Sequence, residues 1–261
     1  MGRHELTYPK AAHSTVKRHD ERGVYALKGI HEIINSSPLL TLSFNVPSSP
    51  YPMSLPMIGQ MGSFSRPSAD LGDPLDLYLH GYVSSRVMNV TRQQGSDEGN
   101  KGLPVSVCAS HCDGVVLALS AFNHSYNYRS AVLFGHAQLV EDPDERLYAM
   151  GLITDAVVPD RFRHTRLPLT GAELQSTSIL RVRIDNGSAK IRTGGVIEDK
   201  KDAENAELVE GTWTGVLPMY SSFGEPIPAE GNKVDVPTYI REFVNEYSKD
   251  NKEYSEKAVR M

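Results

Sequence analysis

Two serines and an arginine, Ser84, Ser85 and Arg86, follow a strand-like run that ends at His80 and Gly81, and this order of residue types suits the binding of an anion. Leucines at positions 75, 77 and 79 alternate as in a strand. A helix that begins directly after such a strand points its free N–H groups and the positive end of its dipole at a bound anion. The two hydroxyls add donors, and the guanidinium is a planar fork that matches phosphate.

Gly81 and His80 add to this pattern, although each residue also has a simpler explanation. Gly81 has no Cβ, so a ligand can approach the backbone closely there. An imidazole at position 80 would face the ligand and exchange a proton near neutral pH. The alternatives are a surface helix capped by serine with a solvated arginine, and a histidine that hydrogen-bonds to backbone at the end of a strand. The residues alone leave both explanations open.

Other candidate chemistry is less favoured by the sequence. Cys108, His111 and Cys112 have the wrong spacing for a zinc knuckle, and no second Cys/His pair completes a tetrahedral site, so the two cysteines are expected to be buried or edge-strand thiols. The chain contains no Walker loop, no Gly-x-Gly-x-x-Gly and no Gly-x-Ser-x-Gly. Residues 124–130 are dense in donors, which suits a groove, a subunit contact or an exposed polar corner. Trp213, the single tryptophan, is more typical of a core than of a cofactor lid.

The composition is that of an ordinary globular domain. The chain has 261 residues, of which 39% are hydrophobic and 23% charged. A net charge of −5 argues against binding to nucleic acid, which needs clustered Lys and Arg. No apolar run approaches the roughly 20 residues that span a membrane, and the first residues lack the apolar stretch of a signal peptide, so a cytoplasmic protein is expected. Two cysteines cannot support a disulfide scaffold.

The apolar spacing predicts many short strands and few helices. Helices are expected over 24–34, 143–157 and 238–248, and Thr170 with Glu173 forms a capping-box pattern for a short one. Strands are expected over 39–44, 53–60, 105–109, 115–119, 128–140, 178–184, 190–193 and 213–219. Asp113-Gly114 predicts a two-residue hairpin turn, and 61–74 and 95–102 are expected to be loops. The pattern favours a small barrel over a doubly wound parallel sheet.

Four groups of residues resemble, in the same order, the pyridoxamine 5′-phosphate oxidase-related, flavin-nucleotide-binding family, and most closely its branch that includes the nitroimidazole-resistance reductases. The matching segments are 77–81 with 85–86, 120–125 with 127–135, 188–194, and 213–218. The resemblance implies a mainly β fold, an FMN-binding split β-barrel with flanking helices, and a homodimer with FMN at the subunit interface. It divides the chain into a polar arm (1–22), the flavin-binding domain (23–220) and a C-terminal extension with a helix (221–261).

The resemblance also assigns roles to individual residues. Ser84, Ser85 and Arg86 would hold the FMN phosphate, and His80 would lie close to the flavin as the catalytic residue. The strand 53–58 would run beside the isoalloxazine ring. The implied cofactor-binding residues are Met57, Ile58, His80, Gly81, Ser84, Ser85 and Arg86, with Tyr128, Arg129 and Ser130 at the site or across the interface, and Lys190, Arg192 and Trp213 near its rim.

The predicted function is an FMN-dependent oxidoreductase that acts on a small organic molecule. NADH or NADPH would reduce the flavin, a nitro compound, quinone or enone would accept the electrons, and His80 would protonate the product. The arginine- and histidine-rich signature of true pyridoxamine phosphate oxidases is missing near the C-terminus, so that activity is not expected. The alternatives are a flavin or haem carrier or sensor, with His111, His124 and His136 as possible haem ligands, and a degenerate barrel that serves as an interaction module. Phosphate contacts alone do not distinguish FMN from a deazaflavin.

Overall fold

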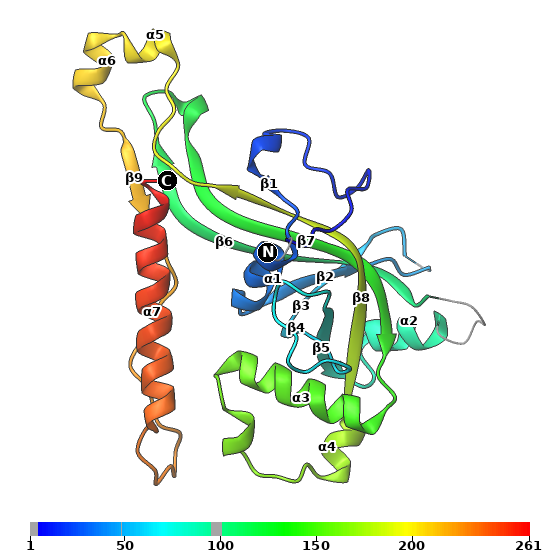
Figure 1. Ribbon diagram of the computed structural model, residues 1–261. Helices are drawn as coiled ribbons and strands as arrows, with labels where there is room; N and C mark the ends of the chain where they lie inside the picture. The colour runs from blue at the N-terminus through cyan, green and yellow to red at the C-terminus, as the bar shows by residue number, and fades with distance from the viewer. Residues whose placement is uncertain (1–4, 48, 95–100) are drawn as a thin grey trace. The chain divides into compact units, whose positions relative to one another are not determined.

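The strands of this chain form one sheet in a computed structural model that describes residues 5–47, 49–94 and 101–261. Their order in the sheet is β3-β2-β6-β7-β8-β5-β4, with β1 paired to β8 and β9 to β6 (Figure 1). The bounds are β1 Gly23–Val24, β2 Leu40–Phe44, β3 Met53–Met57, β4 Gly59–Gly62, β5 Asp76–Tyr82, β6 Leu103–Leu117, β7 Ser125–Leu139, β8 Thr177–Arg192 and β9 Gly215–Pro218.

The sheet is a split barrel. β3 and β4 lie at the two ends of the pairing order, and β3 contacts β5 without pairing to it, so the sheet curls but does not close. β2 pairs antiparallel with both β3 and β6, and β5 pairs antiparallel with both β4 and β8. The mainly β split-barrel fold with flanking helices is therefore confirmed.

Helices flank the sheet. The α-helices are α1 Leu27–Ser36, α2 Arg86–Gln94, α3 Pro143–Val157, α4 Gly171–Ser176, α5 Lys200–Ala203, α6 Ala206–Gly211 and α7 Thr238–Ala258. Short 3₁₀ turns are η1 Asp20–Arg22, η2 Ala121–Asn123 and η3 Phe162–His164. In the described part of the chain, no helix combines the length and the apolar character that crossing a membrane needs.

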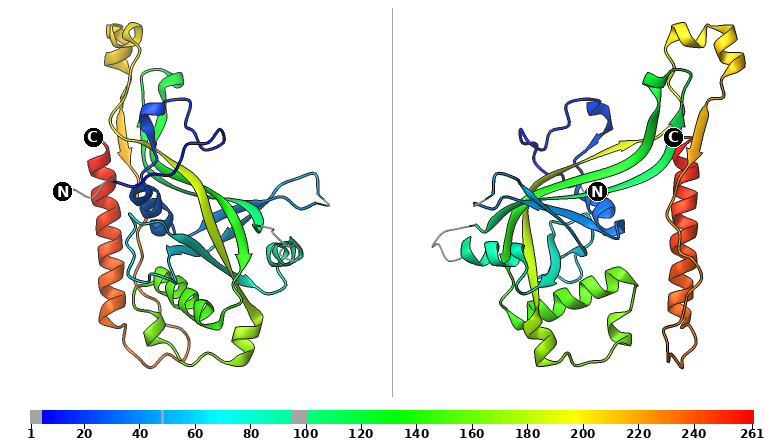
Figure 2. Two further views of the ribbon diagram at one scale, coloured as in Figure 1. Left: turned by 45° about the vertical axis from the view of Figure 1, so that its right-hand side comes forward. Right: turned by 180° about the vertical axis from the view of Figure 1, so that it is seen from behind.

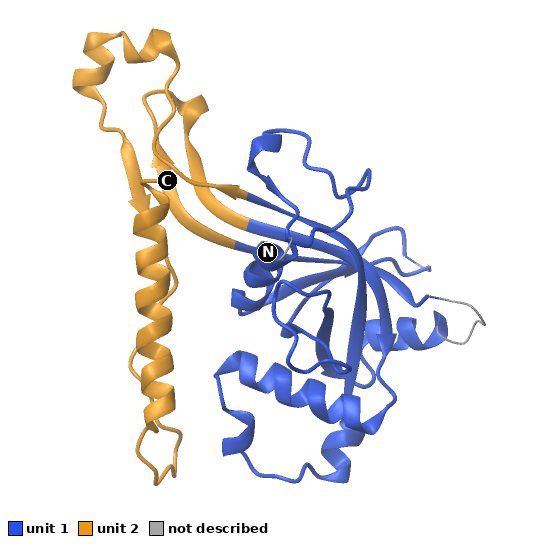
Figure 3. Ribbon diagram, viewed as in Figure 1, with its two compact units in different colours: residues 1–110, 130–190 blue, residues 111–129, 191–261 orange. Residues whose placement is uncertain are grey.

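The chain divides into two compact units (Figure 3). The first comprises residues 1–110 and 130–190, and the second comprises residues 111–129 and 191–261. The long strands β6, β7 and β8 each supply residues to both units. The division at residues 22 and 220 that the sequence suggested stays a prediction.

In the first unit, α3 packs against β4 and β5, and two views in Figure 2 show this helix beside the strands. Ala149 and Ile153 of α3 contact Tyr78 of β5 and Ile179 of β8 in one buried cluster. Strand neighbours alternate between faces, so Leu77 and Leu79, which are also fully buried, point to the opposite face of β5. β5 is therefore covered on both faces.

In the second unit, α7 presents an aromatic stripe to the segment that precedes it. Phe223 packs against Phe243 and Tyr247, with ring centroids 5.3 and 4.8 Å apart. At the other end of the helix, the Gly194 N–H donates to the Ala258 carbonyl oxygen at 2.7 Å. The helix is ten residues longer than predicted. Its buried positions continue past residue 248, with Ser255 and Ala258 almost fully buried.

The predicted hairpin at Asp113-Gly114 is wrong, because β6 runs unbroken through both residues. Gly114 pairs with Pro218 of β9, and Asp113 is buried as the partner of Arg129. The Asp113 carboxylate therefore pairs with a partly buried arginine inside a continuous strand instead of starting a turn. The two predicted strands at 178–184 and 190–193 are likewise one strand, β8.

Two helix starts are confirmed in detail. α3 spans Pro143–Val157 as predicted, and the Asp142 carboxylate caps it by accepting from the N–H groups of Asp144 and Glu145. Thr170 and Glu173 form the reciprocal capping box at the start of α4.

Candidate functional site

The turn between β5 and α2 gathers the serines and the arginine that the sequence singled out. The Ser85 N–H donates to the Tyr82 carbonyl oxygen at 2.9 Å, which closes a tight turn. The Asn89 N–H donates to the Ser85 carbonyl oxygen at 3.0 Å, so α2 begins directly after Ser85. The Asn89 side chain also donates to the Ser84 carbonyl oxygen at 3.0 Å and fixes the turn to the first turn of the helix. Ser84, Ser85 and Arg86 therefore lie together at the helix start, as predicted.

The hydroxyl of Ser85 is buried, and within the described residues no atom hydrogen-bonds to it. A serine at this position usually caps its helix by accepting from a first-turn N–H group. A buried hydroxyl without a partner costs free energy, about 1–3 kcal/mol in mutational data. Such a group is a feature that an incoming hydrogen-bonding ligand would satisfy.

Arg86 is exposed and has no carboxylate partner among the residues that the structure describes. Its Nη1 lies 3.6 Å from the Met53 sulfur, a weak acceptor that leaves the positive charge uncompensated. The charge and the start of α2 therefore favour an anion at the same place.

Gly81 brings the end of β5 close to this turn. A Cβ at position 81 would lie 3.1 Å from the Met88 methyl, 3.5 Å from the Met57 methyl and 3.8 Å from the Ser85 hydroxyl. Any side chain at this position would crowd Met88, so glycine keeps the strand against the helix start. The structure therefore brings the predicted residues Met57, Gly81 and Ser85 together.

A cavity of about 570 Å³ opens beside this cluster. The residues that line it are Val46, Ser49, Ser84, Arg86, Asn89, Val90 and Gln93. Arg86 is the one charged residue among them, so no carboxylate in the lining opposes an anion. The sequence did not single out Asn89, Val90 and Gln93 as site residues, although their spacing from Arg86 places them on one face of α2. Val46 and Ser49 come from the β2–β3 connection and carry no recognisable signal.

His80 lies on the other face of β5. It pairs with Ile179, which belongs to the cluster under α3, whereas its neighbour Gly81 faces Met57 and Ser85. Atoms that exclude water from part of the imidazole lower the pKa of His80, so the ring is neutral at pH 7. Ile58 also packs against the α3 cluster. The structure thus separates the side chain of His80 from the anion cluster, and its catalytic role stays a prediction.

Ser130 and Lys190 bind one another and the N-terminal segment. The Ser130 hydroxyl donates to the Lys190 carbonyl oxygen at 3.1 Å, and the Lys190 ammonium donates to the Arg18 carbonyl oxygen at 2.6 Å. No contact in the described residues joins this pair to Ser84, Ser85 or Arg86. Their predicted place around the cofactor stays a prediction.

Four other predicted residues belong to the second unit, namely Tyr128, Arg129, Arg192 and Trp213. The Arg129 guanidinium donates to both oxygens of Asp113, at 2.7 and 3.0 Å, and lies 3.7 Å from the ring centre of Tyr254. Arg192 donates to the Asn127 side chain and to the Gly195 carbonyl oxygen. Tyr128 is half-buried, and Trp213 is 64% exposed and lies outside the strands. Both arginines are held by partners of their own unit.

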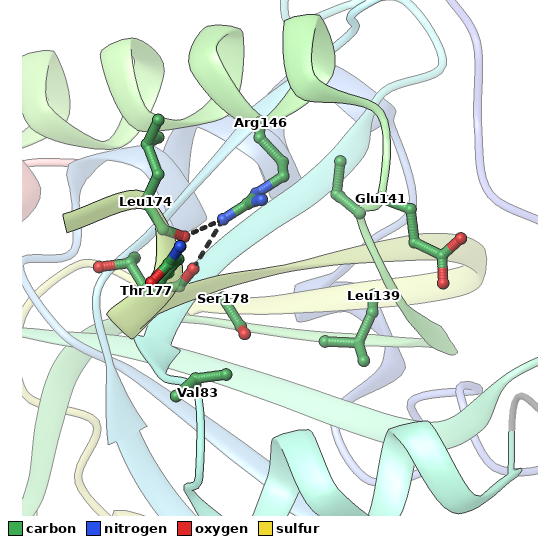
Figure 4. A pocket seen from close by; sticks show the side chains of 9 residues that line it. Val83, Leu139, Glu141, Arg146, Leu174, Thr177 and Ser178 are labelled. Atoms are coloured by element: carbon green, nitrogen blue, oxygen red, sulfur yellow. Dashed lines mark hydrogen bonds between the residues drawn. The ribbon is translucent and has the colours of Figure 1, made fainter. Parts of the chain in front are cut away.

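A second cavity, of about 380 Å³, lies in the first unit (Figure 4). Arg146 points into it from α3 and donates to the carbonyl oxygens of Leu174 and Thr177, so its charge is already solvated by the backbone. Glu141 also lines this cavity, and its carboxylate would repel a bound anion. The arrangement suits an anion less well than the cluster at Arg86.

Comparisons with known proteins agree with the fold. A flavocytochrome from Azotobacter vinelandii superposes with a TM-score of 0.70 at 23% identity, over 89% of this chain and 97% of that one. An FAD and haem binding protein from Mycobacterium smegmatis gives a TM-score of 0.68 at 26% identity, over 85% and 97%. No curated protein matches the chain. The family model described as pyridoxamine 5′-phosphate oxidase matches residues 28–191, more than half of the chain and including the anion cluster, and the chain therefore belongs to the pyridoxamine 5′-phosphate oxidase family.

Proposed function

We propose that this chain is a flavin-dependent oxidoreductase that holds the FMN phosphate, free or as part of a larger flavin nucleotide, at Ser84, Ser85 and Arg86. The carrying observation is the combination of an uncompensated arginine and a buried hydroxyl without a hydrogen bond at the start of α2. The split-barrel fold and the family membership support the same assignment.

Each residue of the site would have a different role in binding the flavin. Arg86 would neutralise the phosphate, and the hydroxyls of Ser84 and Ser85 would donate to its oxygens. Met57 would lie beside the ring system, and Gly81 would keep the end of β5 close to the turn that holds the phosphate. The bound flavin would supply two-electron redox chemistry between a nicotinamide donor and a small nitro, quinone or enone acceptor.

We propose that the imidazole of His80 transfers a proton during the reaction. Because its pKa is lowered, the ring is neutral at pH 7 and can accept a proton or donate a single hydrogen bond. His80→Ala should reduce turnover while the flavin stays bound. Unchanged turnover under saturating donor would remove His80 from the mechanism.

The homodimer that the family resemblance implied also remains a proposal. The second unit leaves large apolar side chains exposed, including Phe122 at 88% and Ile227 at 92%. If these side chains form one contiguous patch in a dimer interface, a second copy would cover them. Light scattering of the purified protein should give twice the mass of one chain.

A second candidate function, a combined flavin and haem redox protein, is favoured by one comparison. The Mycobacterium smegmatis protein described as binding FAD and haem matches 85% of this chain at 26% identity. Of the three histidines considered from the sequence, His124 is exposed and its Nδ1 lies 2.9 Å from the Ser120 carbonyl oxygen, an arrangement that leaves Nε2 for a metal. His136 pairs through Nδ1 with Asp185 at 2.8 Å.

The deciding experiment is the absorption spectrum and the mass of any cofactor released from the purified chain, before and after incubation with FMN, FAD and haem. Flavin in a one-to-one ratio supports the proposed function, and an additional intense Soret band supports the second candidate. A protein that retains none of them overturns both and favours an interaction module.

A further inference from the structure

The cavity of about 380 Å³ beside α3 carries chemistry that the proposed function does not use. All of its lining residues belong to the first unit, and its volume lies in the range of small-molecule sites. One part of the lining is apolar, and the charged part consists of one cation and one anion. The apolar residues are Val83, Leu139, Val140 and Leu174, and the charged ones are Arg146 and Glu141.

The fold holds Arg146 in place without neutralising it. Its Nη2 donates to the carbonyl oxygen of Leu174 and, at 3.0 Å, to that of Thr177. Both acceptors are neutral, and among the described residues no carboxylate pairs with this guanidinium. Its Nη1 and Nε make no hydrogen bond there, so each keeps donors for a ligand. A fixed arginine with free N–H groups is suited to a carboxylate.

The carboxylate of Glu141 is exposed, and it also lacks an ionic partner within the ranges that the structure describes. Figure 4 shows the guanidinium of Arg146 turned toward Leu174 and Thr177 and away from Glu141, so the two charges do not neutralise one another. A ligand with only a negative charge would be repelled by Glu141, and one with only a positive charge would be repelled by Arg146. A ligand that carries both charges would compensate both residues.

We propose that this cavity binds a small zwitterion with an apolar body, which is the chemistry of a free amino acid such as leucine. The carboxylate of the ligand would accept from Arg146, and its ammonium group would donate to Glu141. Its side chain would pack against the apolar part of the lining, where Leu139 and Leu174 lie. This site goes beyond the proposed function, because binding there does not require a flavin.

The first test measures binding of L-leucine to the full-length protein by calorimetry. Two probes of similar shape each lack one charge: 4-methylpentanoate has no ammonium group, and 3-methylbutylamine has no carboxylate. The proposal predicts that L-leucine binds at least ten times more tightly than either probe. No binding of L-leucine, or equal binding of one of the two probes, would overturn the proposal. Neither result bears on the flavin function.

The second test removes one charge of the cavity. Glu141 and Asp144 are both exposed carboxylates near the start of α3, and of the two only Glu141 lines the cavity, so they form a matched pair. Glu141→Gln should weaken binding of L-leucine at least tenfold and should not weaken binding of 4-methylpentanoate. Asp144→Asn should change neither affinity. Equal losses for L-leucine in the two variants, or no loss in Glu141→Gln, would overturn the proposal. If either variant fails to fold, the three affinities of the unaltered protein decide the question.

Discussion

Arg86 and Arg129 make opposite use of the same side chain. Arg129 is held at both ends of its guanidinium by Asp113 and covered by the ring of Tyr254. Arg86 has the Met53 sulfur as its only recorded partner in the described structure, and it stands beside a buried hydroxyl without a hydrogen bond. The first arginine is satisfied by the fold, whereas the second is exposed and is left to solvent or a ligand.

The same contrast separates two histidines. His31 is fully buried, its Nδ1 lies 2.8 Å from the Leu71 carbonyl oxygen, and its Nε2 lies 2.7 Å from the Tyr8 hydroxyl. The imidazole of His80 is exposed and makes no hydrogen bond within the described residues. A buried polar side chain with every partner inside its own unit points to stability, whereas an exposed imidazole stays available for a proton or a ligand.

The largest expected effect concerns Arg129, whose partners all belong to its own unit. Arg129→Ala leaves the buried Asp113 carboxylate unpaired and should lower the free energy of unfolding by about 3–5 kcal/mol. Trp213, the single tryptophan, belongs to the same unit, so denaturant titration followed by its fluorescence reports on the region. Lys249→Ala, which breaks an exposed pair with Glu253 in the same unit, is the control and should cost less than 1 kcal/mol. Similar losses of unfolding free energy in the two variants would contradict the structural role of Arg129.

The buried imidazole of His31 predicts a pH dependence of stability. Burial lowers the pKa of His31 to about 4, whereas the unfolded chain binds this proton near pH 6.5. The unfolded state therefore gains a proton first as the pH falls. Stability should decrease between about pH 6.5 and pH 4 and level off below, by about 3 kcal/mol from this residue. The measurement is the free energy of unfolding against pH, and His31→Gln should flatten the curve. An unchanged slope in that variant would contradict the assignment.

Arg86 should matter for flavin binding and not for stability. Arg86→Ala removes charge-assisted hydrogen bonds to a phosphate, which are typically worth about 1.5–3 kcal/mol, so flavin affinity should fall about 10- to 100-fold. The melting temperature without flavin should not change. A loss of stability in the free protein would instead place Arg86 beside Arg129 as a structural residue.

The smallest effect is expected at Ser85. Ser85→Ala removes a buried hydroxyl that has no partner, so the flavin-free protein should keep its stability or gain up to about 1 kcal/mol. Flavin affinity should fall severalfold, because the ligand loses one donor. Calorimetry of the free and loaded protein measures both. A destabilised free protein would show that the hydroxyl already has a partner, and Ser85 would then be a structural residue like Arg129.

Local rules predicted the helix starts and the turn at Ser84–Arg86. Helix starts depend on residues within one turn of helix, so the sequence alone predicted the start at Pro143 and the Thr170–Glu173 capping box. The hairpin at Asp113-Gly114 failed because Arg129, sixteen positions later, takes up the carboxylate. The face of β5 on which His80 lies and the partners of Arg129 depend on tertiary pairing, which short-range patterns do not contain. Val46 and Ser49 reach the cavity from the β2–β3 connection, and this too depends on tertiary structure.

The alternation along β5 has a consequence for how this protein can change over evolutionary time. Tyr78 and His80 face the α3 side, while Leu77, Leu79 and Gly81 face the other side. One inserted or deleted residue within the strand would exchange these two sets, put Tyr78 where Leu79 belongs, and displace Gly81 from the helix start. Lineages of this protein can therefore vary β5 by substitution, whereas a change in its length would cost the core and the site in a single step.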